Sequence, residues 1–195
     1  MATKAKQIVT LGSSIVFVIM FVFCYILIAQ NRNISTVVNE VDKSTIDTSI
    51  NKLILRDTTS IIKNIGDVSH LIIDDFDKGE CVILANADKN EFVIMRREYG
   101  GFENQYDYFF LSKHTAQIDI SKIKVLIDSH FITNKGAFLN MQEKDFLSKY
   151  TNVNFQQNIT NDTIIYHYID ANMSYECNYY FVDKVLVEIN FGYQY

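Results

Sequence analysis

Near its N-terminus the chain contains one long run of apolar residues. Residues 8–30 contain no charged side chain. An α-helix rises about 1.5 Å per residue, so about 20 such residues span the roughly 30 Å hydrocarbon core of a bilayer. The run therefore predicts a transmembrane helix over residues 8–30, preceded by a short tail, residues 1–7.

A different pattern follows over residues 31–70, where apolar side chains recur every three or four positions. The recurring residues are Ile34, Val37, Val38, Val41, Ile46, Ile50, Leu53, Ile54, Ile61, Ile62, Ile65 and Val68. This spacing predicts a helical stalk in two pieces, with a break near residues 57–60. The apolar residues do not keep a seven-residue repeat over three full heptads, so two interpretations stay open. Either residues 34–54 form a coiled coil between copies of the chain, or the helix packs on the domain that follows.

Beyond Gly79 the pattern changes to short β-rich runs bounded by turn residues. The predicted strands are residues 80–87, 91–99, 106–113, 122–132, 163–170, 174–183 and 185–193. Residues 88–90 suit a hairpin turn, and Gly100 with Gly101 marks a second break. Between the fourth and fifth strands, residues 140–150 predict one short amphipathic helix.

These elements predict an α+β fold for residues 71–195. Strands joined by short connections pair as antiparallel meanders, and one or two short helices lie on one face of the sheet. Alternation in the last strand places four apolar residues on one face: Val185, Val187, Ile189 and Phe191.

Residues 131–191 resemble the small envelope domains of the outer-membrane assembly lipoprotein class (SmpA/OmlA) and the related β-lactamase-inhibitor-like fold. The similar features are a helix introduced by residues 136–141, Gly-Ala-Phe-Leu-Asn-Met, and three strands that end in residues 180–189. The chain departs from the family pattern at Asn140, where a Gly usually precedes the Met, at residues 149–151, where Gly-x-Pro is usual, and in lacking the lipidated Cys. The resemblance implies a non-catalytic binding module of the cell envelope.

Charge sets the orientation expected for the anchor. Lys4 and Lys6 precede the apolar run, whereas Arg32 is the one basic residue between the run and the first acidic residues. The positive-inside rule then places the N-terminus in the cytoplasm and the C-terminal domain in the periplasm or outside the cell.

Processing of the anchor is the competing interpretation. A cleaved signal peptide normally has an apolar core of about 7–15 residues and small residues before the cut, but here the run is longer and a cut after Ala29 would place Leu27 at a small-residue position. Lipidation of Cys24 is disfavoured because Phe23 stands where a small residue is needed. We therefore expect a retained signal anchor.

The outer part is acidic, and this excludes one class of partner. Residues 31–195 carry 16 basic and 23 acidic groups. Binding of phosphate needs clustered Lys and Arg, so no nucleic acid is expected. The motifs GxGxxG, GxxxxGK[ST] and GxSxG do not occur, so we expect no cofactor and no enzymatic activity.

The residues that could bind metal do not have a metal-site spacing. The histidines, His70, His114, His130 and His167, form no HxH, HxxxH or HExxH motif, and the acidic cluster Asp74, Asp75, Asp77 and Glu80 does not follow the EF-hand pattern. No metal ligand and no catalytic residue is predicted, and the acidic cluster is expected to be a solvated turn.

Cys81 and Cys177 are candidates for a disulfide. Both lie in predicted strands of the exported part, where an oxidising compartment permits disulfides. A bridge between them would close a loop of about 95 residues and add about 4 kcal/mol of stability. Two buried free thiols are the alternative.

Aromatic residues are abundant, with 12 Tyr and 14 Phe. Alternation puts Tyr166 and Tyr168 on the same face of the sheet, and Tyr179 lies in a neighbouring predicted strand. If exposed, these three side chains form a binding face; the alternative is packing in the core.

Together these features predict a single-pass, membrane-anchored protein whose outer domain binds another envelope protein, as an accessory subunit of a membrane assembly. Binding of a small ligand or glycan is the second hypothesis, for which a concave aromatic pocket would be the distinguishing observation. An envelope hydrolase is the third, and it requires a nucleophile and a base within hydrogen-bond reach.

Overall fold

A computed structural model describes residues 46–75, 79–114 and 122–194 of the chain. The predicted tail 1–7, the predicted transmembrane helix 8–30 and residues 31–45 of the predicted stalk lie outside the described residues. Within the described ranges, no helix has the length and apolar character needed to cross a membrane.

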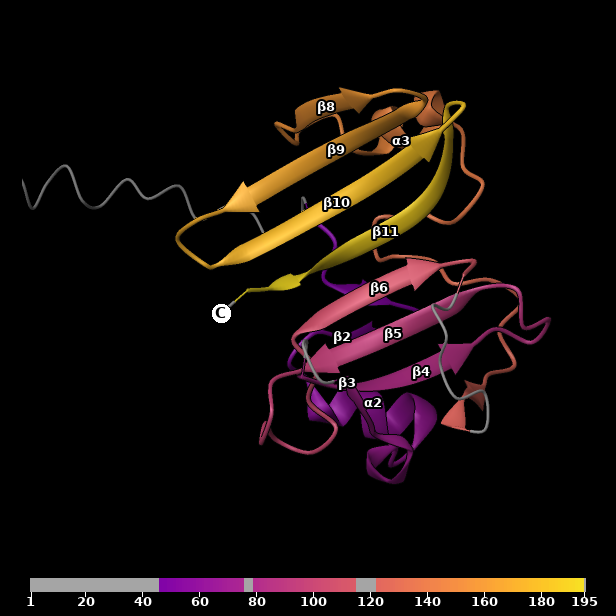
Figure 1. Ribbon diagram of the computed structural model, residues 1–195, viewed down its shortest axis with the longest axis vertical. Coiled ribbons are helices and arrows are strands. Elements are labelled where there is room, and N and C mark those ends of the chain that lie inside the picture. The colour runs from indigo at the N-terminus through magenta and orange to yellow at the C-terminus, as the bar shows by residue number, and fades with distance from the viewer. Residues whose placement is uncertain (1–45, 76–78, 115–121, 195) are drawn as a thin grey trace, which may run out of the picture. The chain divides into compact units, whose positions relative to one another are not determined.

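One large sheet forms the framework (Figure 1). Its strands are β3 (Ile73–Asp75), β4 (Gly79–Ala85), β5 (Phe92–Arg97), β6 (Tyr108–Ser112), β7 (Lys124–Val125), β8 (Gln156–Thr160), β9 (Thr163–Asp170), β10 (Tyr175–Val182) and β11 (Val185–Tyr193). Their order is β3-β4-β5-β6-β11-β10-β9-β8, with every neighbouring pair antiparallel, and β7 pairs in parallel with β4. The predicted antiparallel α+β class is thus confirmed for the described residues.

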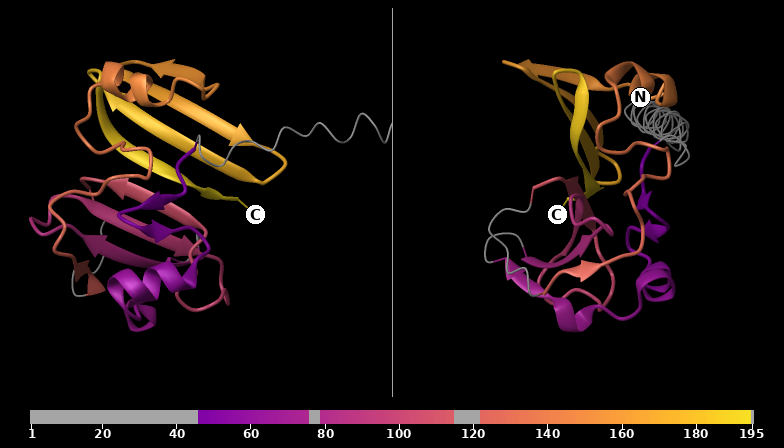
Figure 2. Two further views of the ribbon diagram at one scale, coloured as in Figure 1. Left: turned by 180° about the vertical axis from the view of Figure 1, so that it is seen from behind. Right: turned by 90° about the vertical axis from the view of Figure 1, so that its right-hand side faces the viewer.

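Two short helices lie on the same face of the sheet (Figure 2). Helix α2 (Thr58–Ile65) begins at Asp57, whose side chain accepts a hydrogen bond from the Ser60 amide at 3.1 Å, an N-cap that satisfies one free helical N–H. It buries Ile61 and Ile65 against the sheet. Helix α3 (Glu143–Lys149) buries Phe146 on that face. A single turn of 3-10 helix, η1 (Ser69–Leu71), leads from α2 toward β3.

The described residues contain the same arrangement twice. Helix α2 precedes the meander β3 to β6, and helix α3 precedes the meander β8 to β11 (Figure 1). In each half the start of the helix is tied to the loop between the third and fourth strands. The Arg56 amide donates to the Tyr106 carbonyl at 2.9 Å, and the Glu143 amide donates to the Lys184 carbonyl at 2.9 Å. The two meanders join through their last strands, β6 and β11.

The core of the second half is built from rings that surround Phe146. Its ring centroid lies 4.5 Å from that of Tyr150, 4.6 Å from Tyr179 and 5.2 Å from Phe181. Further rings of Phe155 and Tyr166 lie 5.6 Å away. Aromatic pairs at these separations contribute about 0.5–1.5 kcal/mol each beyond their buried area, so this cluster is a main source of stability for the second half.

Residues 46–54 do not form the predicted helix. They form a small hairpin, β1 (Ser49–Ile50) and β2 (Leu53–Ile54), whose turn residues Asn51 and Lys52 both have positive φ. Ile46, Ile50 and Leu53 are buried in the core of the domain. Of the residues 34–54 that were candidates for a coiled coil, residues 46–54 therefore pack inside the domain and are not available for one. Residues 34–45 lie outside the described residues.

Other predicted elements agree more closely with the structure. Six of the predicted strands and the predicted helix are present, and they differ from the prediction only in where they begin and end. The strands are those predicted over 80–87, 91–99, 106–113, 163–170, 174–183 and 185–193, and the helix is the one predicted over 140–150. The run 122–132 is mostly irregular and contributes only β7. Strands β3 and β8 were not predicted.

Candidate functional site

The register of the sheet separates a covered face from a second, polar face. Cys177, Tyr179 and Phe181 of β10 belong to the core on the helix side. The alternating residues Glu176 and Asn178 therefore point to the opposite side. In the second half, neither of the described helices covers that opposite side (Figure 2). This polar face, made of β6, β11, β10 and β9, is the candidate site.

A chain of hydrogen bonds crosses the polar face from strand to strand. His167 Nδ1 of β9 is bonded to Asn178 Oδ1 of β10. The Asn178 amide donates to Asn190 Oδ1 of β11 at 2.9 Å. The Tyr108 hydroxyl of β6 donates to the same Asn190 oxygen at 2.8 Å. Asn190 in turn donates to Glu188 at 3.3 Å. Since each amide uses its oxygen and its nitrogen, both asparagines are held in one orientation.

Burial strengthens this polar chain. Asn178 and Asn190 are 9% and 6% exposed although they lie on the face without a helix. Burial also raises the pKa of the Tyr108 hydroxyl well above its ordinary value, with the nearby Glu176 carboxylate adding to the effect. Tyr108 therefore stays protonated and remains a donor at neutral pH. Burial raises the pKa of Glu188 too, against the lowering effect of the Asn190 hydrogen bond.

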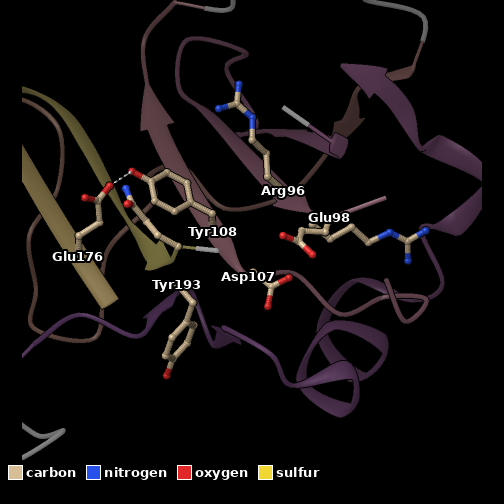
Figure 3. Close-up of a pocket in the computed structure, with 8 residues that line it drawn as sticks. Arg96, Glu98, Asp107, Tyr108, Glu176 and Tyr193 are labelled. Carbon is tan, nitrogen blue, oxygen red and sulfur yellow. Dashed lines mark hydrogen bonds between the residues drawn. The ribbon is translucent and has the colours of Figure 1, made fainter. Parts of the chain in front are cut away.

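A pocket of about 280 Å³ continues the polar face at one end (Figure 3). It is lined by Arg96, Arg97, Glu98, Asp107, Tyr108, Glu176, Tyr193 and Gln194. Tyr108 and Glu176 belong to both the pocket and the polar face, where the Tyr108 hydroxyl lies 3.3 Å from Glu176 Oε1. The pocket and the hydrogen-bonded chain therefore form one continuous polar surface.

Ion pairs fix the walls of the pocket. Arg97 lies 2.7 Å from Glu80 and is almost completely buried. Arg56 lies 2.6 Å from Asp107 and places its guanidinium 3.8 Å above the ring of Tyr193. A guanidinium that is paired and stacked in this way is held in place. The pocket is thus preformed on strands and braced by charge pairs.

Gly192 allows β11 to approach β6 beside the pocket. A Cβ atom placed on Gly192 would lie 2.2 Å from the Asp107 carbonyl oxygen and 2.5 Å from the Tyr108 Cα. Any side chain at this position would push Asp107 and Tyr108 away from β11. The glycine is therefore required for the close contact that forms this end of the site.

The chemistry available at the site is recognition through hydrogen bonds and charge. Its side chains are amides, carboxylates, guanidinium groups and tyrosines, and its histidine, His167, is paired with an amide. Over the residues that the structure describes, no three His, Cys, Asp or Glu side chains are grouped so that they would hold a metal ion.

The predicted binding face of Tyr166, Tyr168 and Tyr179 was wrong. Tyr166 and Tyr168 do share a face, since they pair with Tyr179 and Cys177, but that face carries the helices. Tyr179 is 0% exposed and Tyr166 is 7% exposed, and Tyr168 packs partly buried against the same core. Core packing, the alternative, explains all three side chains.

The predicted disulfide was also wrong. Cys81 and Cys177 are both buried, and they form no disulfide. Strands β5, β6 and β11 lie between β4 and β10, and four strand spacings amount to about 19 Å at about 4.8 Å each. A disulfide requires Cα atoms closer than about 7 Å. The two thiols also lie on opposite faces, Cys177 in the main core and Cys81 with Ile83 and Ile94.

One buried acid was not singled out from the sequence. Asp47 is 0% exposed and accepts hydrogen bonds from the hydroxyls of Tyr150 and Tyr179, both at 2.5 Å. The Lys135 amide donates to it at 3.1 Å, and its own carbonyl accepts from Tyr175. Burial raises the pKa of Asp47, although the two tyrosines and Thr133 oppose the shift. No ligand could reach this carboxyl group, so we assign it to the core.

A second hollow, of about 560 Å³, lies between the β1–β2 hairpin and residues 126–132. Ile127 on its rim is 97% exposed. Beside it, the buried Glu91 accepts hydrogen bonds from the Phe131 amide and from His130 Nδ1, both at 2.9 Å. His130 therefore helps to hold the loop of residues 126–132 in place through its hydrogen bond to Glu91.

Comparison of the chain with protein-family models, with curated proteins and with solved structures gives no match.

Proposed function

We propose that the chain is a membrane-anchored, extracytoplasmic protein-binding module, an accessory subunit of an envelope assembly, and that the polar face binds the partner. The observation that supports this most is the hydrogen-bonded chain of Tyr108, Asn190 and Asn178 across three strands. Polar groups held in one orientation on strands recognise a partner with little loss of conformational entropy on binding. Such an ordered set of donors and acceptors is more than solvation of a surface requires.

The composition of the polar face supports a protein partner. Apolar and aromatic side chains share the face with the polar chain: Ile165 and Tyr180 are half-buried and Ile169 is 54% exposed. Protein interfaces combine apolar and tyrosine side chains with oriented hydrogen-bonding groups in this way. The rigid pocket beside Glu176 then suits one projecting polar side chain of the partner.

The proposal of a membrane anchor is based on the sequence alone. Residues 8–30 carry no charge and follow Lys4 and Lys6, as expected for a helix that crosses the membrane with its N-terminus in the cytoplasm. An anchored domain works near the membrane surface, so its partner is expected to be another envelope protein.

The test is a comparison of variants of the full chain, purified by affinity from gently solubilised membranes. Tyr180→Ala and Ile169→Ser alter the polar face at partly exposed positions, and Ile62→Ser changes a 49% exposed residue of α2 on the helix side. We expect the proteins that remain bound to the wild type and to Ile62→Ser to be lost from both polar-face variants. Equal retention by all four chains would refute the proposed surface.

The second candidate function is binding of a small ligand in the pocket. At about 280 Å³ the pocket is at the lower limit of ligand sites, which commonly enclose about 300–1,000 Å³. Its lining is mainly charged, with Tyr108 and Tyr193 as the aromatic members. These properties favour a side chain of a protein partner over a free ligand enclosed in the pocket.

A further inference from the structure

The sheet ends in a strand whose outer edge is available for pairing. Strand β8 pairs with β9 along one side, and no described strand pairs along its other side. All five residues from Gln156 to Thr160 are exposed. The strand contains no charged residue and no proline, two of the features that natural edge strands use to prevent further pairing.

The opposite end of the sheet is different. Strand β3 is only three residues long and carries Asp74 and Asp75. Next to it, the far end of β4 at Leu84 and Ala85 is covered by β7. A short, acidic edge and a covered neighbour discourage pairing with another strand. Of the two ends, β8 alone has the properties of a pairing edge.

The residues around β8 are nearly neutral in an acidic chain. Residues 150–169 contain one formal charge, Asp162, although charged residues make up 21% of the whole sequence. The outer part as a whole has more acidic than basic groups, so two copies repel each other over most of their surfaces. At β8 that repulsion is weakest, which makes a second copy of the chain a suitable occupant.

We propose that two copies of the chain associate by antiparallel pairing of β8 with β8, centred on Asn158, so that the two sheets become one. A two-fold axis through Asn158 brings each strand opposite itself, and the residues of β8 whose backbone N–H and C=O groups face away from β9 gain hydrogen bonds in each copy. Ile159, which is 65% exposed, then lies beside Gln157 of the other copy on the helix side of the sheet. Pairing covers an apolar side chain that the single copy leaves in water.

The affinity of such a contact is modest, because the contact is short. Interfaces that are stable in dilute solution usually bury more than about 1,200 Å². Confinement of both copies to one membrane by residues 8–30 raises their effective concentration and favours the pair. The pairing itself depends on β8, whereas its strength depends on the proposed anchor.

The first test is cross-linking of the full chain in lipid vesicles. In a Cys24→Ser background, Asn158→Cys places two thiols on the two-fold axis, where Cα atoms of opposite residues lie about 4.5–5.5 Å apart and a disulfide fits. Ile62→Cys, at a residue that is 49% exposed on α2, is the matched control. We expect at least about tenfold more disulfide-linked dimer from Asn158→Cys than from the control. Equal yields from the two variants would overturn the proposal.

The second test measures mass without cross-linking, by sedimentation of the full chain in detergent at high concentration. Ile159→Lys places two like charges as diagonal neighbours on one face of the pair, about 7–8 Å apart, and also puts a lysine on the pairing edge. Ile62→Lys puts the same charge on α2, at a residue that is 49% exposed. We expect dimer for the wild type and for Ile62→Lys, and monomer for Ile159→Lys. A dimer that survives Ile159→Lys would show a different interface and overturn the proposal, as would a wild type that is monomeric and does not cross-link. Partner retention by the polar-face variants is measured separately, so failure of one proposal leaves the other intact.

Discussion

Replacement of Asp47 tests whether the second half of the domain depends on its buried carboxyl group. In Asp47→Ala, three donors lose their acceptor: the hydroxyls of Tyr150 and Tyr179 and the amide of Lys135. The Thr133 hydroxyl loses a hydrogen-bond partner as well. A buried polar group without a partner costs about 1–3 kcal/mol. Three such groups give an expected loss in the free energy of unfolding of about 3–9 kcal/mol, a large part of the roughly 5–15 kcal/mol of an ordinary domain.

The measurement is urea unfolding of the full chain in detergent, followed by near-ultraviolet circular dichroism of the tyrosines. Asp47→Asn keeps one acceptor oxygen and nearly the same volume, so we expect a loss of only about 1–2 kcal/mol. Asp145→Ala removes an exposed acid of α3 and should change stability by less than about 0.5 kcal/mol. A loss below about 1 kcal/mol for Asp47→Ala, with an unchanged slope against urea, would refute the structural role of the carboxyl group.

The pH dependence gives an independent check. Burial raises the pKa of Asp47 above its ordinary value of 3.8, so the folded state holds its proton more tightly than the unfolded chain. Its contribution is complete below pH 3.8 and declines as pH rises through the pKa of the folded state. Asp47→Asn removes this titration, so the stability of the wild type relative to Asp47→Asn should fall as pH rises above 3.8. A constant difference would contradict the raised pKa.

Three further predictions follow from single residues. Gly192→Ala should destabilise the domain by more than about 2 kcal/mol in urea unfolding, because a Cβ at 2.2 Å from the Asp107 carbonyl oxygen forces β11 away from β6. The control Gly100→Ala, where positive φ is the sole obstacle, should lose about 1 kcal/mol. Similar losses for the two variants would refute the clash at Gly192. Hydrogen bonds from the Ser69 backbone and from Asn104 lower the pKa of Asp67 to about 2, so its stabilising effect is present above pH 3.8 and is lost as pH falls toward 2. Asp67→Asn should therefore flatten the acid side of the plot of stability against pH. An unchanged plot would count against these hydrogen bonds. Cys81 and Cys177 should react with a maleimide only after unfolding, since both are buried thiols that form no disulfide, and mass spectrometry that found them oxidised to each other would contradict the structure.

Strand positions were predictable wherever one side of the strand is buried and the other is not. Strand β9 occupies the predicted residues 163–170, because β-branched and aromatic residues fill a run that is bounded by turn residues. Strand β8 was missed because all of its residues are exposed, so no alternation marks it. Alternation showed that Tyr166 and Tyr168 share a face, but it cannot say which face the helices cover.

Two errors arose because different structures produce the same spacing. Ile50 and Leu53 are three residues apart, as on a helix, but here they face each other across a two-residue turn. That turn, Asn51–Lys52, has positive φ at both positions, a conformation that Asn tolerates well. In β11 a bulge opposite Tyr180 and Phe181 pairs Phe181 with Leu186, so Leu186 is fully buried where Val187 was expected.

The candidate site was harder to foresee, because its residues come from strands far apart in the sequence. One signal was present. Asparagine is depleted in strands, and both Asn178 and Asn190 lie well inside long ones. An amide at such a position requires partners, and here the two amides are partners of each other. Tyr108 could not have been joined to them without the β6–β11 pairing.

The position of β11 between β6 and β10 also determines how the domain must fold. The first meander is synthesised early, yet β6 gains its second neighbour only when residues 185–193 emerge. At about 5–20 residues per second, β6 waits for several seconds as an unpaired edge that contains Phe109, Phe110 and Leu111. Closure of a loop this long is slow, and exposed apolar edges aggregate in the meantime. During biosynthesis, the first half therefore depends on a strand that does not yet exist, and protection of β6 is the step at which a chaperone would have the greatest effect.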